Sequence, residues 1–133
     1  MDMKQVYICS PCRGDVKRNI ELAQKAGHFA ALCGRVPVIP HLVFPQFLND
    51  NDPEERVLAL TLAVEQLKSC DELWLIGGKI SKGMRYELET AKEYRIPVRC
   101  YDVYLHRIAP KTIAVDDRVD DEYRRAIYGA TLL

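Results

Sequence analysis

The stretch CDELWLIGGKISKGMRYE, residues 70–87, contains the patterns of a strand, a glycine turn and a helix start in immediate succession. Residues 72–76 form a short apolar run typical of a buried strand, and two glycines end it. Residues 81–83 then lead into a helix that carries Glu87 in its first turns. Such a corner binds anions and sugars in α/β proteins, because the first N–H groups of a helix are free to donate there.

Glu87 is the carboxylate of this corner that the helical pattern turns inward. Leu88 and Ala91 lie on the expected inner face, and Glu87 lies on its flank. Glu89 and Glu93 project to the opposite, solvent side. We therefore predict that Glu87 is a reactive group against which the protein positions a nucleotide-like ligand. The alternative is a first-turn glutamate that only stabilises the helix dipole.

Outward from this stretch, strand and helix patterns alternate. Asp15 and Asp52 precede two helical patterns as N-caps, and Gly34 follows the first as a stop. The alternation predicts a three-layer, flavodoxin-like (Rossmann-like) α/β domain, with a parallel sheet of four to five strands and helices on both faces. We expect strands at 5–9, 36–39, 72–76 and 97–101, and helices at 15–33, 53–69 and 82–94. The expected inner faces of the first two helices are Val16, Ile20, Ala23, Gly27 and Ala30, and Val57, Leu60, Val64 and Leu67.

Two parts of the chain are less regular. Residues 40–56 are rich in proline and aromatics, too apolar for a surface loop and too broken for a helix or strand. Residues 105–133 are expected to be a C-terminal extension, with a strand or turn near 106–113 and a helix around 117–128. The length of 133 residues predicts one domain spanning 1–133.

Composition excludes several classes of protein. The 19 basic and 19 acidic residues cancel, so electrostatic binding to nucleic acid or to an anionic membrane is not indicated. No apolar run approaches the ~20 residues of a membrane span, and the N-terminal apolar stretch is too short for a signal peptide. We therefore expect a cytoplasmic protein whose five cysteines are thiols rather than disulfides.

Three loops are expected to meet at the carboxyl ends of the strands, where parallel sheets bind ligands. In the first, Ser10, Arg13 and the backbone of Gly14 precede a helix and are suited to hold a phosphate. The alternative is that Arg13 is an ordinary surface residue that binds no ligand. In the second, His41 follows a strand and is a candidate ligand contact, and Phe44 and Gln46 are suited to stack on and hydrogen-bond a flat base. Simple packing of this loop is the alternative.

Cys9 and Cys12 form a CxxC pair after a strand, so a redox site is a further hypothesis. The helix is expected to start at Asp15 rather than at the first cysteine, which argues against it. A zinc site needs two more ligands, and no second CxxC exists. The phosphate-loop and dinucleotide glycine motifs are also absent. We therefore expect neither a metal nor a cofactor.

The motifs SPxRGD, PHLxFPQFL, CDELW and ISxGMxxE together resemble a small family of bacteria and phages within the nucleoside 2-deoxyribosyltransferase-like superfamily. That superfamily includes deoxynucleoside-monophosphate N-glycosidases, and the resemblance covers about residues 5–101. It implies that Glu87 is the nucleophile at C1′ and that Tyr7 orients it. It further implies a loop and turn that bind the 5′-phosphate, formed by Ser10, Arg13, Gly14, Ser81 and Gly83.

The resemblance implies an N-glycosidic bond hydrolase or deoxyribosyltransferase that works as a homodimer or larger homo-oligomer. Two positions depart from the pattern. A second acid would fall on Ala63, and spacing does not decide whether Asp15, Asp50 or Glu65 replaces it; the small residue two before the glutamate is Arg85. The missing acid favours an alternative, a protein that binds or sequesters a nucleotide without turnover.

Overall fold

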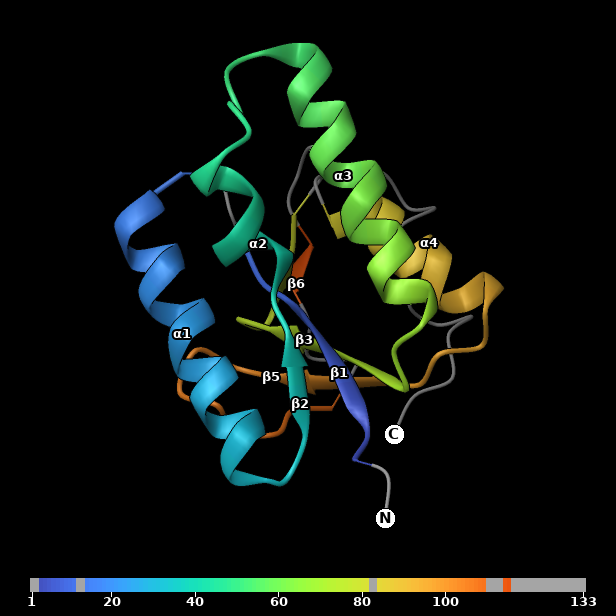
Figure 1. The fold of residues 1–133 in the computed structure, drawn as a ribbon. Helices are drawn as coiled ribbons and strands as arrows, with labels where there is room; N and C mark the ends of the chain where they lie inside the picture. Colours follow the sequence, from blue (N-terminus) through green and yellow to red (C-terminus); the bar gives the residue numbers. More distant parts are fainter. Residues whose placement is uncertain (1–2, 12–13, 82–83, 110–113, 116–133) are drawn as a thin grey trace.

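The computed structural model describes residues 3–11, 14–81, 84–109 and 114–115. Its centre is a parallel sheet of four strands (Figure 1). The strands lie in the order β2-β1-β3-β5 and all neighbours run parallel. This arrangement confirms the predicted flavodoxin-like α/β fold. The strands are β1 Gln5–Cys9, β2 Val36–Val38, β3 Glu72–Ile76 and β5 Val98–Tyr101.

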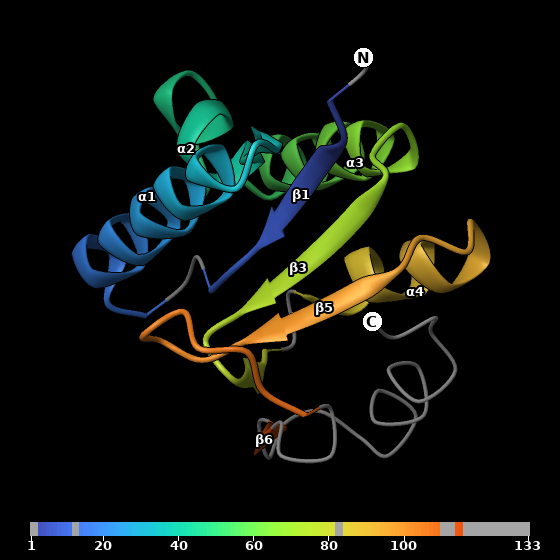
Figure 2. The same ribbon diagram turned by 90° about the horizontal axis from the view of Figure 1, so that it is seen from below.

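Helices cover both faces of this sheet. Helix α1 (Val16–Leu32) lies on one face, and α3 (Pro53–Lys68) and α4 (Arg85–Glu93) lie on the other (Figures 1 and 2). Alternate strand residues supply the two cores. The core beneath α1 includes Val6, Ile8, Trp74, Ile76 and Tyr101 with Ala26 and Ala30. The core beneath α3 and α4 includes Tyr7, Cys9, Leu73 and Leu75 with Ala63, Leu67, Leu88 and Ala91.

The predicted caps are confirmed. The Asp15 side chain accepts a hydrogen bond from the Arg18 N–H at 3.2 Å at the start of α1. The Asp52 side chain accepts one from the Glu54 N–H at 2.9 Å at the start of α3, where Pro53 is the first helical residue. Each cap satisfies an N–H group that the helix itself cannot pair. For this reason the two helix starts could be predicted from the sequence.

The segment after β2 is more regular than predicted. Residues 40–56 were expected to contain no helix before the one beginning at residue 53, but Pro40–Val43 form helix α2 and Phe44–Gln46 form the 3-10 turn η1. Pro40 is the first residue of α2, where its fixed φ suits a helix and its missing N–H costs nothing. The prolines that suggested a broken segment therefore start two short helical turns.

The inner faces of the helices were predicted only in part. Val16 and Ile20 of α1 are 57% and 41% exposed, and Val57 of α3 is 64% exposed. The buried residues of α1 are Ala23, Ala26, Gly27 and Ala30, and those of α3 are Ala63 and Leu67. Helix α3 carries apolar residues around most of its circumference, so periodicity alone does not show which face packs.

Helix α4 begins at Arg85, later than the predicted residue 82; residues 82–83 lie outside the described parts of the chain. A second, two-stranded parallel sheet was not predicted: β4 (Lys79–Ile80) pairs with β6 (Ala114–Val115). Within the predicted region 106–113 the structure shows an isolated antiparallel bridge between Tyr101 and Arg107. The predicted C-terminal helix lies outside the described residues. Among those described, no helix has the length and apolarity to cross a membrane.

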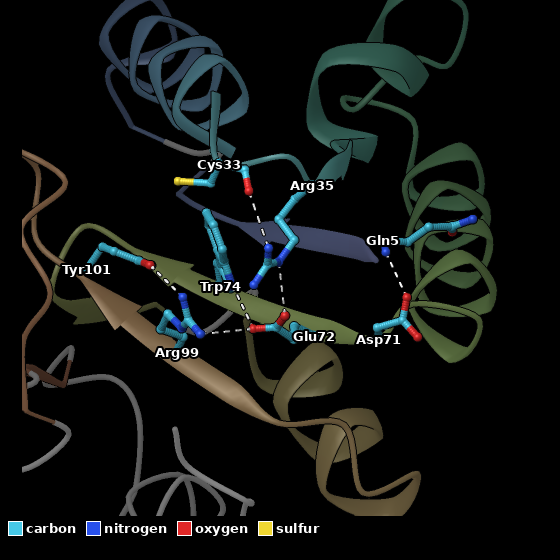
Figure 3. A network of polar contacts seen from close by, with 8 residues as sticks. All are labelled: Gln5, Cys33, Arg35, Asp71, Glu72, Trp74, Arg99 and Tyr101. Atoms are coloured by element: carbon cyan, nitrogen blue, oxygen red, sulfur yellow. Dashed lines mark hydrogen bonds and ion pairs between the residues drawn. The ribbon is translucent and has the colours of Figure 1, made fainter. Parts of the chain in front are cut away.

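At the edge of the sheet where the strands begin, Glu72 is a buried carboxylate inside a polar network (Figure 3). Sequence patterns did not reveal this network. Its Oε2 lies 3.3 Å from Arg35 Nε, and its Oε1 lies 3.5 Å from Arg99 Nη2. The Trp74 indole N–H donates to Oε1 at 3.3 Å. Two cations and one indole thus compensate this charge, as buried charges require.

Asp71 lies at the same edge, away from the carboxyl ends of the strands. Its side chain is exposed and accepts a hydrogen bond from the Gln5 N–H at 2.7 Å (Figure 3). This hydrogen bond connects the start of β3 with the start of β1, so Asp71 has a structural role.

Candidate functional site

Tyr7, His41 and Glu87 meet on the face of the sheet that α3 and α4 cover. His41 Nε2 lies 3.7 Å from Glu87 Oε2. The Tyr7 hydroxyl lies close enough to Glu87 for the carboxylate charge to act on it. Tyr7 and Glu87 are almost completely buried, at 0% and 1% exposure. A titratable triad from three separate elements is thereby assembled in the protein interior.

Local structure explains each placement. Tyr7 is an odd-numbered residue of β1, so its ring points to the same core as Leu73 and Leu75. His41 is the second residue of α2, three residues after the end of β2 at Val38. Glu87 lies in the first turn of α4, beside the buried Leu88, which confirms its predicted inward tilt.

Tyr7 is held in its neutral form. Burial raises the pKa of Tyr7 far above its ordinary value, and the nearby charge of Glu87 raises it further. The geometry between the two groups is less favourable than that of an ordinary hydrogen bond, although they are close enough to influence each other. The phenol is therefore a donor that keeps its proton and can face the carboxylate.

Several buried polar atoms of this region lack a hydrogen-bond partner among the described residues: Tyr7 Oη, Ser10 Oγ and Glu87 Oε2. Leaving such an atom unsatisfied costs about 1–3 kcal/mol each, so native proteins rarely keep them without a reason. Tyr7 Oη and Glu87 Oε2 belong to neighbouring side chains, and a polar ligand would supply the missing partners.

The predicted phosphate-binding residues are described in part. Ser10 is buried directly after β1, and Gly14 adopts a φ of +94° just before the cap of α1, with open space beside it. Ser81 is half-buried after β4, and its carbonyl accepts from the Met84 N–H at 3.1 Å. Arg13 and Gly83 lie outside the described residues. Because β1 and β3 are neighbours, the loops that follow them leave the same edge of the sheet.

The predicted base-contacting residues separate into two groups. His41 faces Glu87, a contact that no spacing in the sequence indicates. Phe44 is half-buried against the core and stacks edge-to-face on Phe47, with ring centroids 5.9 Å apart. The Gln46 side-chain amide donates to the Leu42 carbonyl at 2.6 Å, so the local backbone engages it.

The cysteines give a redox or metal site little support. Burial raises the pKa of Cys70 and of Cys100 to about 11, which makes both thiols poor nucleophiles. Within the described ranges, no group of three or more histidine, cysteine or acidic side chains is arranged to hold a metal. Cys12 of the predicted CxxC lies outside those ranges.

Replacing Tyr7 with phenylalanine is expected to flatten the dependence of stability on alkaline pH. The folded pKa of Tyr7 is raised above its unfolded value near 10. The contribution of Tyr7 to the free energy of unfolding is therefore fully present below that pH. Above it, the unfolded chain releases the proton and the folded chain does not, which lowers stability by up to about 1.4 kcal/mol per pH unit. Urea unfolding of both proteins at about pH 9, 10 and 11 measures the difference. The buried cysteines are the same in both, and equal slopes would contradict the expectation.

Comparison with solved structures finds proteins of similar fold. The chain is similar to the solved structure of a 2-deoxyribosyltransferase from the psychrotolerant bacterium Bacillus psychrosaccharolyticus, with a TM-score of 0.60 and 18% identity. That similarity covers 81% of this chain and 79% of the other. A conserved protein from Enterococcus faecalis V583 matches with a TM-score of 0.52 and 21% identity, over 75% of this chain and 64% of that one. At these identities the similarity demonstrates the fold alone.

No curated protein sequence matches the chain. One family model does match, over residues 4–101, which include β1 to β5 and every described member of the candidate site. The chain therefore belongs to the family described as a domain of unknown function (DUF7768).

Proposed function

We propose that the protein cleaves or transfers the N-glycosidic bond of a nucleoside or nucleotide, with Glu87 as the nucleophile. The observation that carries the proposal is the buried Glu87 carboxylate, flanked by His41 at 3.7 Å and by the neutral Tyr7. The fold, similar to that of a 2-deoxyribosyltransferase, supports the same substrate class.

In the proposed reaction, a Glu87 oxygen attacks C1′ of the sugar while the C1′–N bond breaks toward the base. The product is a glycosyl ester on Glu87, which water or a second base then resolves. Tyr7 holds the carboxylate in position through its O–H. The reaction as proposed uses no metal or cofactor.

A phosphate or hydroxyl of the ligand would be bound by the loops after β1 and β4. The buried hydroxyl of Ser10 and the exposed backbone of Gly14 are suited to this task, and we assign Arg13, Ser81 and Gly83 to it as well. Binding energy gained there would position C1′ against Glu87, far from the bond that breaks.

A second candidate function is nucleotide binding without turnover. Ala63, at the position where the resemblance implies a second acid, is 4% exposed within α3 and has no group that can transfer a proton. In either function we expect a homodimer or larger assembly. The support is the exposed apolar residues of α3, namely Val57, Leu58 and Leu62.

The two functions are separated by incubating the wild-type protein with a panel of deoxynucleotides and ribonucleotides. Chromatography follows free base, and mass spectrometry of acid-quenched samples searches for a sugar adduct on the peptide containing Glu87. Base release with such an adduct supports the enzyme. Thermal stabilisation by a nucleotide that is recovered chemically unchanged supports the binding protein and contradicts catalysis.

A further inference from the structure

We propose that His41 is the proton carrier of this reaction: its Nε2 protonates the departing base and then takes a proton from the water that resolves the ester. The inference rests on the proposed function of Glu87. It assigns to His41 a chemical role beyond contact with the base.

The position of His41 fits this role. Its Nε2 lies 3.7 Å from Glu87 Oε2, so any sugar carbon bonded to Glu87 comes within a few ångströms of the imidazole. The His41 side chain is 20% exposed, whereas that of Glu87 is 2% exposed. The imidazole can therefore exchange its proton with solvent while the carboxylate remains covered.

The short separation also favours two displacements over one. A single displacement by water needs about 6.5–9.5 Å between the two groups, because the water must fit beside the sugar. Two atoms 3.7 Å apart leave no room for a water between them, since each hydrogen bond spans about 2.8 Å. The 3.7 Å separation is nearer to the roughly 5–5.5 Å of a double displacement than to the spacing of a single one, and so favours direct attack by Glu87 followed by hydrolysis of the ester.

The Tyr7 hydroxyl beside Glu87 is a poor acid. The Tyr7 phenol has a strongly raised pKa and keeps its proton through neutral pH. An imidazole ordinarily titrates near neutral pH, so it can give a proton in one step and accept one in the next.

The proton balance closes over the cycle. In the first step the Glu87–C1′ bond forms, the C1′–N bond breaks with its electron pair going to the base, and the base nitrogen takes the proton of His41 Nε2. In the second step water attacks C1′, the ester bond breaks with its pair returning to Glu87, and neutral His41 takes the proton of the water. Both residues then regain their starting states.

The test compares two deoxynucleotides under rapid mixing, which isolates the first step. Adenine needs a proton to leave, whereas 7-methylguanine is already cationic and leaves as a neutral base. His41→Gln is expected to slow release of adenine about 10²–10³-fold and release of 7-methylguanine tenfold or less. His41→Asn is a second variant in case the first folds poorly, and His28→Gln, an exposed histidine of α1, is the matched control.

Each result is decisive. A rate of base release that falls for adenine but not for 7-methylguanine supports His41 as the proton donor. Equal loss with both bases, or no loss, overturns this assignment while leaving the proposed function intact. If the wild-type protein releases free base from neither of these nor from any other nucleotide of the panel, the proposed function itself fails, and the assignment fails with it.

Discussion

Glu87→Gln is expected to reduce base release by at least about 10³-fold while leaving the protein as stable as the wild type, or more so. The loss follows from chemistry, because an amide oxygen cannot form the glycosyl ester. Chromatography of free base under saturating nucleotide measures the first effect, and urea unfolding measures the second.

The stability effect follows from the burial of Glu87. The side chain is 2% exposed, and its Oε2 has no hydrogen-bond partner among the described residues. An ionised carboxylate in such surroundings costs free energy that folding must offset. The amide has almost the same shape without the charge, and His41, which is 20% exposed, can give up its proton to solvent when the carboxylate is gone. We therefore expect a gain of about 1 kcal/mol in the free energy of unfolding.

Glu89→Gln is the matched control, since it removes the same charge from the exposed side of α4. Glu89 forms a surface ion pair with Arg85 at 2.8 Å, four residues apart. Its loss should cost about 0.5 kcal/mol or less and leave base release unchanged. A Glu87→Gln protein that is strongly destabilised would show that the carboxylate is structural; full activity would exclude it as the nucleophile.

Much of the fold was predictable because local signals agreed with one another. Buried parallel strands give continuous apolar runs, and the strand at 72–76 has the bounds predicted for it. Aspartate caps located the starts of α1 and α3. The inward tilt of Glu87 followed from helical periodicity, because its neighbours on α4 are clearly divided between apolar and charged sides.

The remaining features depend on contacts between distant parts of the chain. The approach of His41 to Glu87 requires α2 and α4 to be placed by the sheet, and no local pattern encodes it. Glu72 is the first residue of the strand expected at 72–76, and its carboxylate can be buried because Arg35 and Arg99 reach it from other parts of the chain. A sequence shows a carboxylate in each case, but only the fold shows which partners compensate its charge.

Glu72→Gln is therefore expected to have the opposite effect on stability from Glu87→Gln. The amide removes the charge that two guanidinium groups share, and its NH₂ group can face them only as another donor. Exposed ion pairs contribute about 0–1 kcal/mol, and breaking a fully buried pair costs about 3–5 kcal/mol. The Arg35 and Arg99 side chains are 27% and 23% exposed, which places the expected loss near 2 kcal/mol.

Urea unfolding of Glu72→Gln and of Asp71→Asn measures this loss against a neighbouring acid at the same edge. Asp71 is exposed and accepts one hydrogen bond, from the Gln5 N–H, which an asparagine oxygen can also accept. Its replacement should cost about 0.5 kcal/mol or less. Both variants should retain base release, because this edge is opposite the candidate site. If Glu72→Gln were as stable as the wild type, the two arginines would not depend on its charge, and the distinction between a structural and a reactive buried glutamate would fail.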